Sequence, residues 1–169
     1  DAGRRHRGGP VRRAARSVDQ VEPLDLEAQL GAHRPQQRHV AGAPVALVIA
    51  PTRELALQVS NELQWLYAQT GARIVSCVGG MDPRSERRAL DQGCQIVVGT
   101  PGRLRDHLER GQLRLDHLGA VILDEADEML DLGFREELEE ILDATPKARR
   151  TLLFSATYPV GIKQLASKF

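Results

Sequence analysis

From residue 44 onward, the chain alternates short apolar runs with longer amphipathic segments. The run "VALVIA" (45–50) is continuously apolar, which is typical of a strand buried on both faces of a sheet. The stretches "QIVVGT" (95–100) and "AVILD" (120–124) are also predicted strands. Strands that alternate with helices form parallel sheets with helices on both faces. The sequence therefore predicts an α/β fold built on a parallel sheet.

Turn and capping residues help to place the other elements. Asp82 and Pro83 are residue types preferred at the N-cap and at the first helical position, so they predict the start of a helix. Two helices are expected to turn one apolar side to the core, through Leu55, Val59, Leu63 and Leu66 in the first and Phe134, Leu138, Ile141 and Leu142 in the second. The predicted strands are 45–50, 73–78, 95–100, 120–124 and 151–156, and the predicted helices are 52–70, 82–93, 100–108, 134–142 and 159–169.

The composition fits one globular domain. With 169 residues, 41% of them hydrophobic, the chain is long enough for one core, and its net charge of zero gives no global argument for nucleic acid. Cys77 and Cys94 form no CxxC pair, which favours a reduced cytosolic protein without a structural zinc. No apolar run approaches the length of a membrane span, and the basic start lacks the apolar core of a secretory signal. We therefore expect a cytoplasmic protein without membrane contact.

Residues 1–40 differ from residues 41–169. The first segment contains eight Arg, no Lys and no aromatic residue, and its apolar residues follow neither a helical nor a strand period. One interpretation is a basic arm that binds phosphates. The other is a disordered tail, or non-native sequence from a frameshift or misplaced start in a GC-rich gene. We favour the second, because no aromatic residues interleave the charges.

Four carboxylates crowd the end of the apolar run 120–124. They are Asp124, Glu125, Asp127 and Glu128. A carboxylate at the tip of a buried strand suits Mg²⁺ bound to nucleotide phosphates, and a second one can activate the water that attacks the γ-phosphate. A helix N-terminus also favours acidic residues, but that explanation does not account for an Asp that ends an apolar strand.

Short polar motifs follow the other predicted strands as well. They are "PTREL" (51–55), "GG" (79–80), "TPGR" (100–103) and "SAT" (155–157), besides "DEAD" (124–127). Taken singly, each fits an ordinary cap or turn. In parallel sheets, however, ligands bind at the carboxyl ends of the strands. Five motifs in this order on one sheet edge therefore point to a shared site.

This combination resembles the DEAD-box family of ATP-dependent RNA helicases, over residues 44–169. The resemblance implies the first of the family's two RecA-like domains, a parallel sheet with helices on both faces. It implies that Asp124 holds Mg²⁺ and that Glu125 activates the attacking water. It also implies that Asp127, with Ser155, Ala156 and Thr157, couples the nucleotide state to the RNA surface.

The same resemblance implies a second group of residues that hold the phosphodiester backbone of one RNA strand, independently of its sequence. Threonine hydroxyls, helix N-terminal amides, glycine backbone and Arg side chains are suitable groups for that contact. The implied RNA-binding residues are Pro51, Thr52, Arg53, Glu54, Gly79, Gly80, Thr100, Pro101, Gly102 and Arg103.

The sequence departs from the family pattern upstream of "VALVIA". No A-x-x-G-x-G-K-T loop, which holds the ATP phosphates, is found, and the only lysines are Lys147, Lys163 and Lys168. We expect a RecA-like sheet that is incomplete on its N-terminal side, with two neighbouring strands left unpaired where a central strand is missing. The second RecA-like domain is not expected in this chain either.

We therefore predict a fragment of an ATP-dependent RNA helicase, which binds ATP and Mg²⁺ in the parent enzyme but does not bind ATP tightly or turn over alone. One alternative is a non-catalytic RNA-binding or regulatory module. Another is the product of a frameshifted gene that does not fold stably. A DNA helicase is less favoured, because "PTREL", "TPGR" and "DEAD" together point to RNA.

Overall fold

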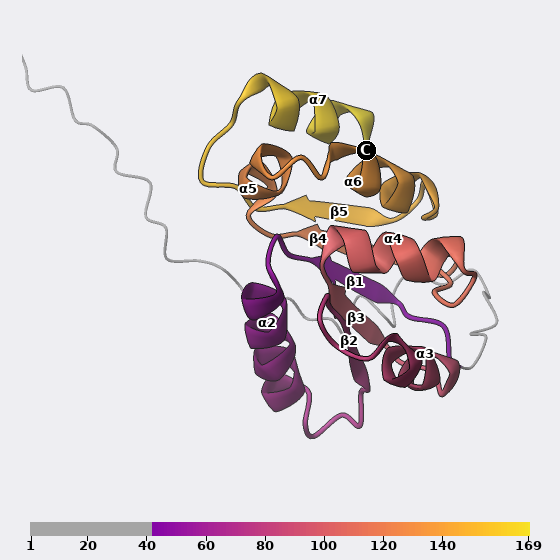
Figure 1. Ribbon diagram of the computed structural model, residues 1–169. Helices are drawn as coiled ribbons and strands as arrows, with labels where there is room; N and C mark the ends of the chain where they lie inside the picture. The colour runs from indigo at the N-terminus through magenta and orange to yellow at the C-terminus, as the bar shows by residue number, and fades with distance from the viewer. Residues whose placement is uncertain (1–41) are drawn as a thin grey trace, which may run out of the picture. The chain divides into compact units, whose positions relative to one another are not determined.

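The structure, a computed structural model, describes residues 42–169, and five strands of this range form one parallel sheet (Figure 1). The strands are β1 (Ala46–Ile49), β2 (Ile74–Cys77), β3 (Ile96–Gly99), β4 (Ala120–Leu123) and β5 (Arg150–Leu153). Their spatial order is β2-β3-β1-β4-β5, and every neighbouring pair is parallel. The predicted α/β parallel sheet is therefore confirmed, whereas the segment 1–40 lies outside the described residues.

Six helices of the described range pack around the sheet. They are α2 (Arg53–Leu66), α3 (Pro83–Asp91), α4 (Pro101–Glu109), α5 (Ala126–Asp131), α6 (Arg135–Asp143) and α7 (Val160–Lys168). Asp82 caps α3 by accepting a hydrogen bond from the Arg84 N–H at 3.0 Å, as predicted. The apolar pattern does not predict α5, because its six residues are too few to show a helical period.

The two faces of the sheet carry separate apolar clusters, because alternate strand residues point to opposite sides. Leu47 and Ile49 face a large core cluster, whereas Ala46 and Val48 face a smaller one. Helix α2 covers the smaller cluster, and α3, α4, α5, α6 and α7 supply side chains to the larger one. Helices on both faces of the sheet are thus confirmed.

The apolar side of the first helix differs from the prediction at its last turn. Leu55, Val59 and Leu63 pack against the sheet, but Leu66 is 59% exposed. The row of residues spaced by four continues instead to Tyr67, which packs against the same cluster. The helix itself ends at Leu66, and turns lead from there to Gly71.

The expected gap between two neighbouring strands is wrong for the described sheet. β1 lies in the middle and pairs with both β3 and β4, so the free edges of the described sheet fall on β2 and β5. β5 also ends at Leu153, so Ser155 and Ala156 follow this strand rather than belong to it. Within residues 42–169, no helix has the length and apolar character needed to cross a bilayer.

Gly99, the last residue of β3, provides a test of this packing. A Cβ at this position would lie 2.5 Å from the Cys77 carbonyl oxygen and 2.8 Å from the Leu104 side chain. We expect Gly99→Ala to lower the free energy of unfolding by about 1–3 kcal/mol, because neither the backbone nor the buried leucine can move away freely. Urea denaturation measures the change. Gly102→Ala is the control, since nothing lies within 4 Å of its Cβ, and an equal loss of stability in both variants would contradict the explanation.

Candidate functional site

The five motifs lie at one edge of the sheet, because all five strands are parallel and each motif follows the carboxyl end of its strand. The strand order divides this edge into two halves. Residues 79–80, 100–103 and 51–54 follow the neighbouring strands β2, β3 and β1. Residues 124–127 and 155–157 follow β4 and β5. The glycine- and arginine-containing motifs therefore lie together, and the acidic motif lies beside the serine–threonine motif.

Asp124 and Glu125 form the turn between β4 and α5. The Asp124 N–H donates to the Ile49 carbonyl at 2.9 Å, and the Glu125 N–H donates to Asp124 Oδ1 at 3.1 Å. Glu125 has φ 48° and ψ 52°, and it is the only residue other than glycine with positive φ among residues 42–169. A left-handed conformation is costly for a residue with a Cβ and is often found at functional sites. The turn holds the exposed Glu125 carboxylate beside Asp124.

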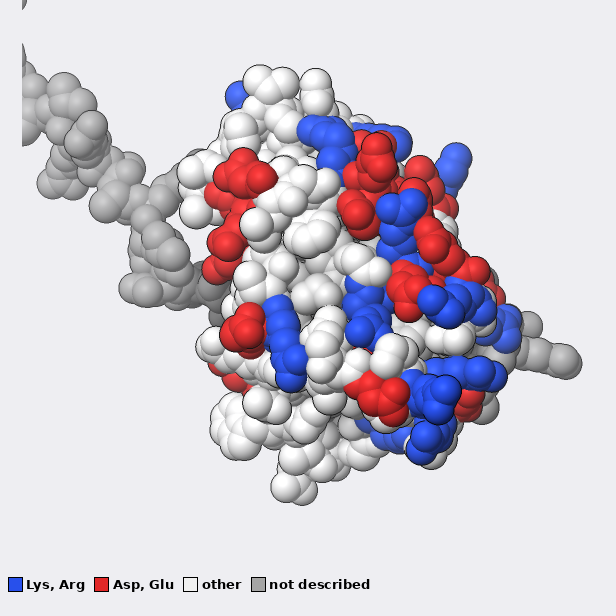
Figure 2. Space-filling view, viewed as in Figure 1, with Lys and Arg blue, Asp and Glu red and all other residues white. Residues whose placement is uncertain are grey.

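Acidic side chains gather over α5 (Figure 2). Loss of solvation raises the pKa of Glu125, and the nearby carboxylates of Glu128, Asp124 and Asp127 raise it further. A raised carboxyl pKa suits a group that accepts a proton from water. The same repulsion would be relieved by a bound cation, and carboxylate oxygens are the ligands that Mg²⁺ prefers. The residues present therefore fit a magnesium ion held by Asp124.

Asp127 links the start of α5 to the segment after β5. Its Oδ2 accepts hydrogen bonds from the Thr157 N–H at 2.9 Å and the Thr157 hydroxyl at 2.7 Å. The Asp127 N–H donates to Ser155 Oγ at 3.2 Å, and that hydroxyl donates to the Thr157 carbonyl at 2.7 Å. The bonds from Thr157, followed by the contribution of Ser155, lower the pKa of Asp127 to about 2. Ala156 lies exposed between these two residues.

Arg53 and the glycine pair form a second contact between motifs. The Arg53 guanidinium donates from Nη1 to the Gly79 carbonyl at 3.2 Å. Gly80 has φ +77°, and a Cβ on it would lie 2.5 Å from Arg53 Nη1. The positive φ favours glycine at residue 80, and a Cβ there would also displace the Arg53 guanidinium. Pro51 is buried, Glu54 is exposed, and the Thr52 hydroxyl caps α2 by accepting from the Leu55 N–H at 3.3 Å.

The third motif forms the N-terminus of α4. Thr100 is the N-cap residue but its side chain makes no capping bond, so its hydroxyl is not committed to the helix. Pro101 is buried, whereas Gly102 is exposed and has open space around it. Arg103 is partly enclosed, since only 14% of its side chain is exposed. Its guanidinium lies 3.4 Å from the Glu86 carboxylate and donates to the Met81 carbonyl at 3.4 Å.

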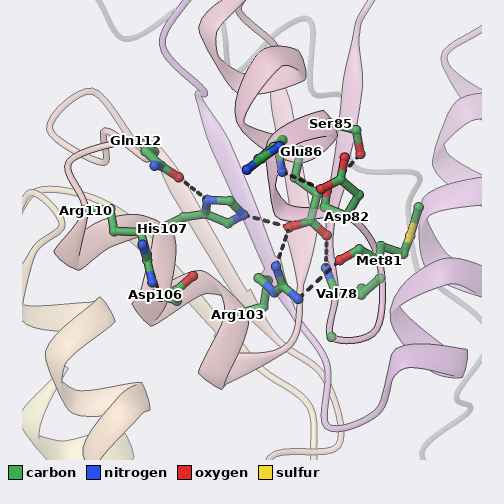
Figure 3. Close-up of polar contacts among 12 residues, drawn as sticks. Val78, Met81, Asp82, Ser85, Glu86, Arg103, Asp106, His107, Arg110 and Gln112 are labelled. Carbon is green, nitrogen blue, oxygen red and sulfur yellow. Dashed lines mark hydrogen bonds and ion pairs between the residues drawn. The ribbon is translucent and has the colours of Figure 1, made fainter.

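Glu86 and His107 belong to this region, although no sequence pattern singles out Glu86, which lies in a strongly polar helix. They are 3% and 0% exposed, and His107 Nε2 lies 2.7 Å from Glu86 Oε2 (Figure 3). The one available signal is the spacing of His107 four residues after Arg103, which places both on one side of α4.

Cys77 lies close to the same pair, and the three potential ligand atoms are all within 4.8 Å of one another. Metal ligands must release their protons. Here burial, followed by the negative charge of Glu86, raises the pKa of the Cys77 thiol. The imidazole and the carboxylate are also already hydrogen-bonded to each other. We therefore interpret the cluster as a hydrogen-bonded network rather than a metal centre.

Comparison with known proteins agrees with this geometry. The sequence model described as "DEAD/DEAH box helicase" matches residues 28–165. The chain belongs to the DEAD/DEAH box helicase family. A crystal structure of a DEAD box protein from Methanococcus jannaschii aligns with a TM-score of 0.72 at 45% identity, over 77% of this chain and 35% of that one. The RecA-like fold implied by the sequence motifs is confirmed by this alignment.

Two curated members of the DEAD/DEAH box family are similar to the chain in sequence. The DEAD-box ATP-dependent RNA helicase CshA of Geobacillus kaustophilus is 52% identical over 124 residues, which cover 73% of this chain and 27% of CshA. The ATP-dependent RNA helicase DeaD of Haemophilus influenzae is 48% identical over 148 residues, which cover 86% of this chain and 23% of DeaD. The chain thus spans about a quarter of the length of these relatives. The family match begins at residue 28, inside the Arg-rich segment, and the domain boundary near residue 41 stays a prediction.

The hydrogen bonds between Thr157 and Asp127 can be tested through the pKa of the Asp127 carboxyl group. The folded-state pKa of Asp127, about 2, lies below the ordinary value of 3.8. The stabilisation is therefore complete above the ordinary value and is lost as the pH falls from about 4 to about 2. Thr157→Val should raise this pKa, because the hydroxyl donor is removed. NMR titration of the side-chain carboxyl carbon measures it.

Thr70→Val is the control for that titration, because the Thr70 hydroxyl bonds to the Tyr67 carbonyl after the last turn of α2. It should leave the Asp127 titration where it is. An Asp127 pKa that is the same with and without the Thr157 hydroxyl would show that this bond does not hold the carboxylate.

Proposed function

We propose that the chain is the part of an ATP-dependent RNA helicase that carries the water-activating carboxylates and the RNA-backbone contacts of a first RecA-like domain. The observation that carries the proposal is the strand order, which gathers five separate motifs on one sheet edge and sorts them into an acidic half and a glycine–arginine half. Relatives at about half identity are described as ATP-dependent RNA helicases. A shared edge for both halves is what coupling of hydrolysis to RNA binding requires.

In the acidic half, Asp124 would hold Mg²⁺ and Glu125 would position and deprotonate water. A bound Mg²⁺ supplies positive charge against the β- and γ-phosphates of the nucleotide. The left-handed turn fixes the Glu125 carboxylate next to Asp124, and its raised pKa favours proton acceptance. The chain thus supplies the metal-side and water-side groups of a hydrolytic site.

In the glycine–arginine half, the described groups suit one strand of RNA backbone. Arg53 is exposed, and the free hydroxyl of Thr100 stands at the N-terminus of α4 beside the open surface of Gly102. Backbone N–H groups at a helix start and Arg side chains bind phosphate without reading bases. The chain would therefore bind single-stranded RNA with little sequence preference.

Within the acidic half, Asp127 would pass a change at the nucleotide side to the segment after β5. Its carboxylate joins α5, directly after the water-activating Glu125, to Thr157 after β5. A change in the Asp124–Glu125 turn on nucleotide binding would therefore shift the segment 155–157. Arg53 and Gly79 join two of the RNA-side motifs in the same manner.

A second candidate function is RNA binding without catalysis. It is favoured by the sequence itself, which contains the motifs of the glycine–arginine half but no A-x-x-G-x-G-K-T loop. The two candidates differ in what they require of ATP. The helicase function requires a phosphate loop that works with Asp124, whereas the binding module would hold RNA equally well with or without nucleotide.

RNA affinity tests the phosphate contacts. Arg53→Ala should weaken binding of any single-stranded RNA to a similar extent, because a backbone contact carries no base information. The plot of log affinity against log salt concentration should also become shallower, with a slope smaller in magnitude by roughly 0.7. Fluorescence anisotropy at several salt concentrations measures both quantities.

Arg114→Ala is the matched control for that experiment, because Arg114 precedes β4 and so lies before the amino end of a strand rather than after its carboxyl end. Its removal should leave affinity and slope nearly unchanged. If Arg53→Ala altered preference between RNA sequences and left the slope intact, Arg53 would be reading bases rather than phosphates.

Thermal melting with Mg-ATP tests the nucleotide side. We expect no rise in melting temperature for the 169-residue chain at millimolar Mg-ATP, because carboxylates without a phosphate loop repel the triphosphate. A ligand at 100 times its dissociation constant would add about 2.7 kcal/mol, which a melting curve resolves. A clear rise that Asp124→Ala removes would show that the chain contains a phosphate site, and would favour the catalytic function over the binding module.

A further inference from the structure

Glu86 is a buried carboxylate on α3 that contacts the residue after β2 and two side chains of α4. Its Oε1 accepts from the N–H of Val78, the residue directly after β2, at 2.9 Å. Its Oε2 lies 2.7 Å from His107 Nε2 and 3.4 Å from Arg103 Nη1, both on α4 (Figure 3). A buried charge without such partners would be costly. The Glu86 carboxylate is therefore surrounded by three polar partners, the Val78 N–H, His107 and Arg103.

Arg103 makes a second link between α3 and the loop after β2. Its Nη2 donates to the Met81 carbonyl, which directly follows the glycine pair, while its Nη1 faces Glu86. The guanidinium thus touches both the helix that bears Glu86 and the loop that bears Gly79 and Gly80. The N-terminus of α4 and the glycine loop are connected through one carboxylate and one arginine.

His107 determines the charge of this cluster. Its Nδ1 lies 2.8 Å from Gln112 Oε1, an acceptor, and its Nε2 faces the Glu86 carboxylate, a second acceptor. An imidazole that donates from both nitrogens is an imidazolium. With His107 charged, it balances Glu86 and the cluster retains the positive charge of Arg103. With His107 neutral, Glu86 and Arg103 cancel.

We propose that Glu86 and His107 are positioning residues for RNA binding: Glu86 holds the Arg103 guanidinium between α4 and the glycine loop, and His107 offsets the Glu86 charge so that Arg103 keeps its own for phosphate. This inference rests on the proposed RNA function, and it takes Arg103 of the glycine–arginine half as one of the phosphate contacts. Neither residue touches RNA itself, and both act through that arginine. The glycine loop and the start of α4 then meet the RNA backbone as one rigid unit.

A pH dependence follows. The hydrogen bond to Glu86, supported by that to Gln112, raises the pKa of His107 against the opposing effect of burial. Near His107, the other charged or titratable groups are Cys77 on β2, Arg103 and Asp106, and Asp106 pairs with Arg110. On α6, which packs against α4, Glu137 and Glu140 pair with Arg105. Because the folded pKa is raised, the charged cluster is complete below the ordinary histidine range and is lost as the pH rises through the folded value. RNA affinity should fall over that rise.

The test uses the full 169-residue chain and a single-stranded oligouridine, with affinity measured by anisotropy as a function of pH. Arg103→Ala should weaken binding about tenfold, as expected for loss of a charged hydrogen bond. Glu86→Gln should weaken it by about threefold through loss of preorganisation, and should add nothing in the Arg103→Ala background. His107→Gln should remove the pH dependence, whereas His117→Gln, whose ring pairs with the exposed Asp116, should keep it.

An NMR titration of the His107 ring separates the possible failures, since it needs no RNA. A raised His107 pKa that drops in Glu86→Gln establishes the network; a His107 titration unaffected by Glu86→Gln overturns the inference. A second outcome is that the network is present and Arg103→Ala weakens binding, but Glu86→Gln and His107→Gln bind RNA as well as the unmodified chain at every pH. In that case the positioning role is wrong while the RNA function stands. If Arg103→Ala binds normally, the proposed RNA contact of Arg103 fails, and the inference fails with it.

Glu109→Gln, an exposed carboxylate-to-amide change on the same helix, should alter none of these measurements. Circular dichroism checks folding, and if Glu86→Gln does not fold, the pH profile of His107→Gln decides alone.

Discussion

The parallel pairing of β1 with both β3 and β4 is the constraint on which the rest of the structure depends. Parallel strands present all their carboxyl ends at one edge, so residues that follow strands far apart in the chain become neighbours there. The central place of β1 decides which motifs meet. It puts the loop of Arg53 beside that of Thr100 on one side and beside Asp124 on the other.

In each half of this edge, one carboxylate links two separate segments of the chain through hydrogen bonds or an ion pair. Asp127 accepts two hydrogen bonds from Thr157 and fixes the segment after β5 to α5. Glu86 accepts from Val78 and faces His107 and Arg103, and so joins β2 to α4. Both carboxylates connect separate strand ends, so each half can respond as a unit when a ligand alters one of its loops.

Much of the fold could be predicted from residue pattern. The buried strand within 45–50 and the Asp82–Pro83 helix start depend on local burial and capping, and both agree with the structure closely. Errors arose where a tertiary contact outweighed the pattern. Leu66 is exposed because Tyr67 takes the next position in the apolar row, and the expected central gap is absent because strand order cannot be inferred from apolar runs.

The sequence alone determined the strands, the motifs that end them and the family to which these motifs belong, because each depends on a few consecutive residues. It could not show that Glu86 is buried, since the surrounding helix is polar and the partners His107 and Val78 lie 21 and 8 residues away. Nor could it show that Arg103 is partly enclosed by Glu86 and Met81. Those features were decided by the tertiary structure, because a buried charge is stable only where the fold brings donors from separate segments together.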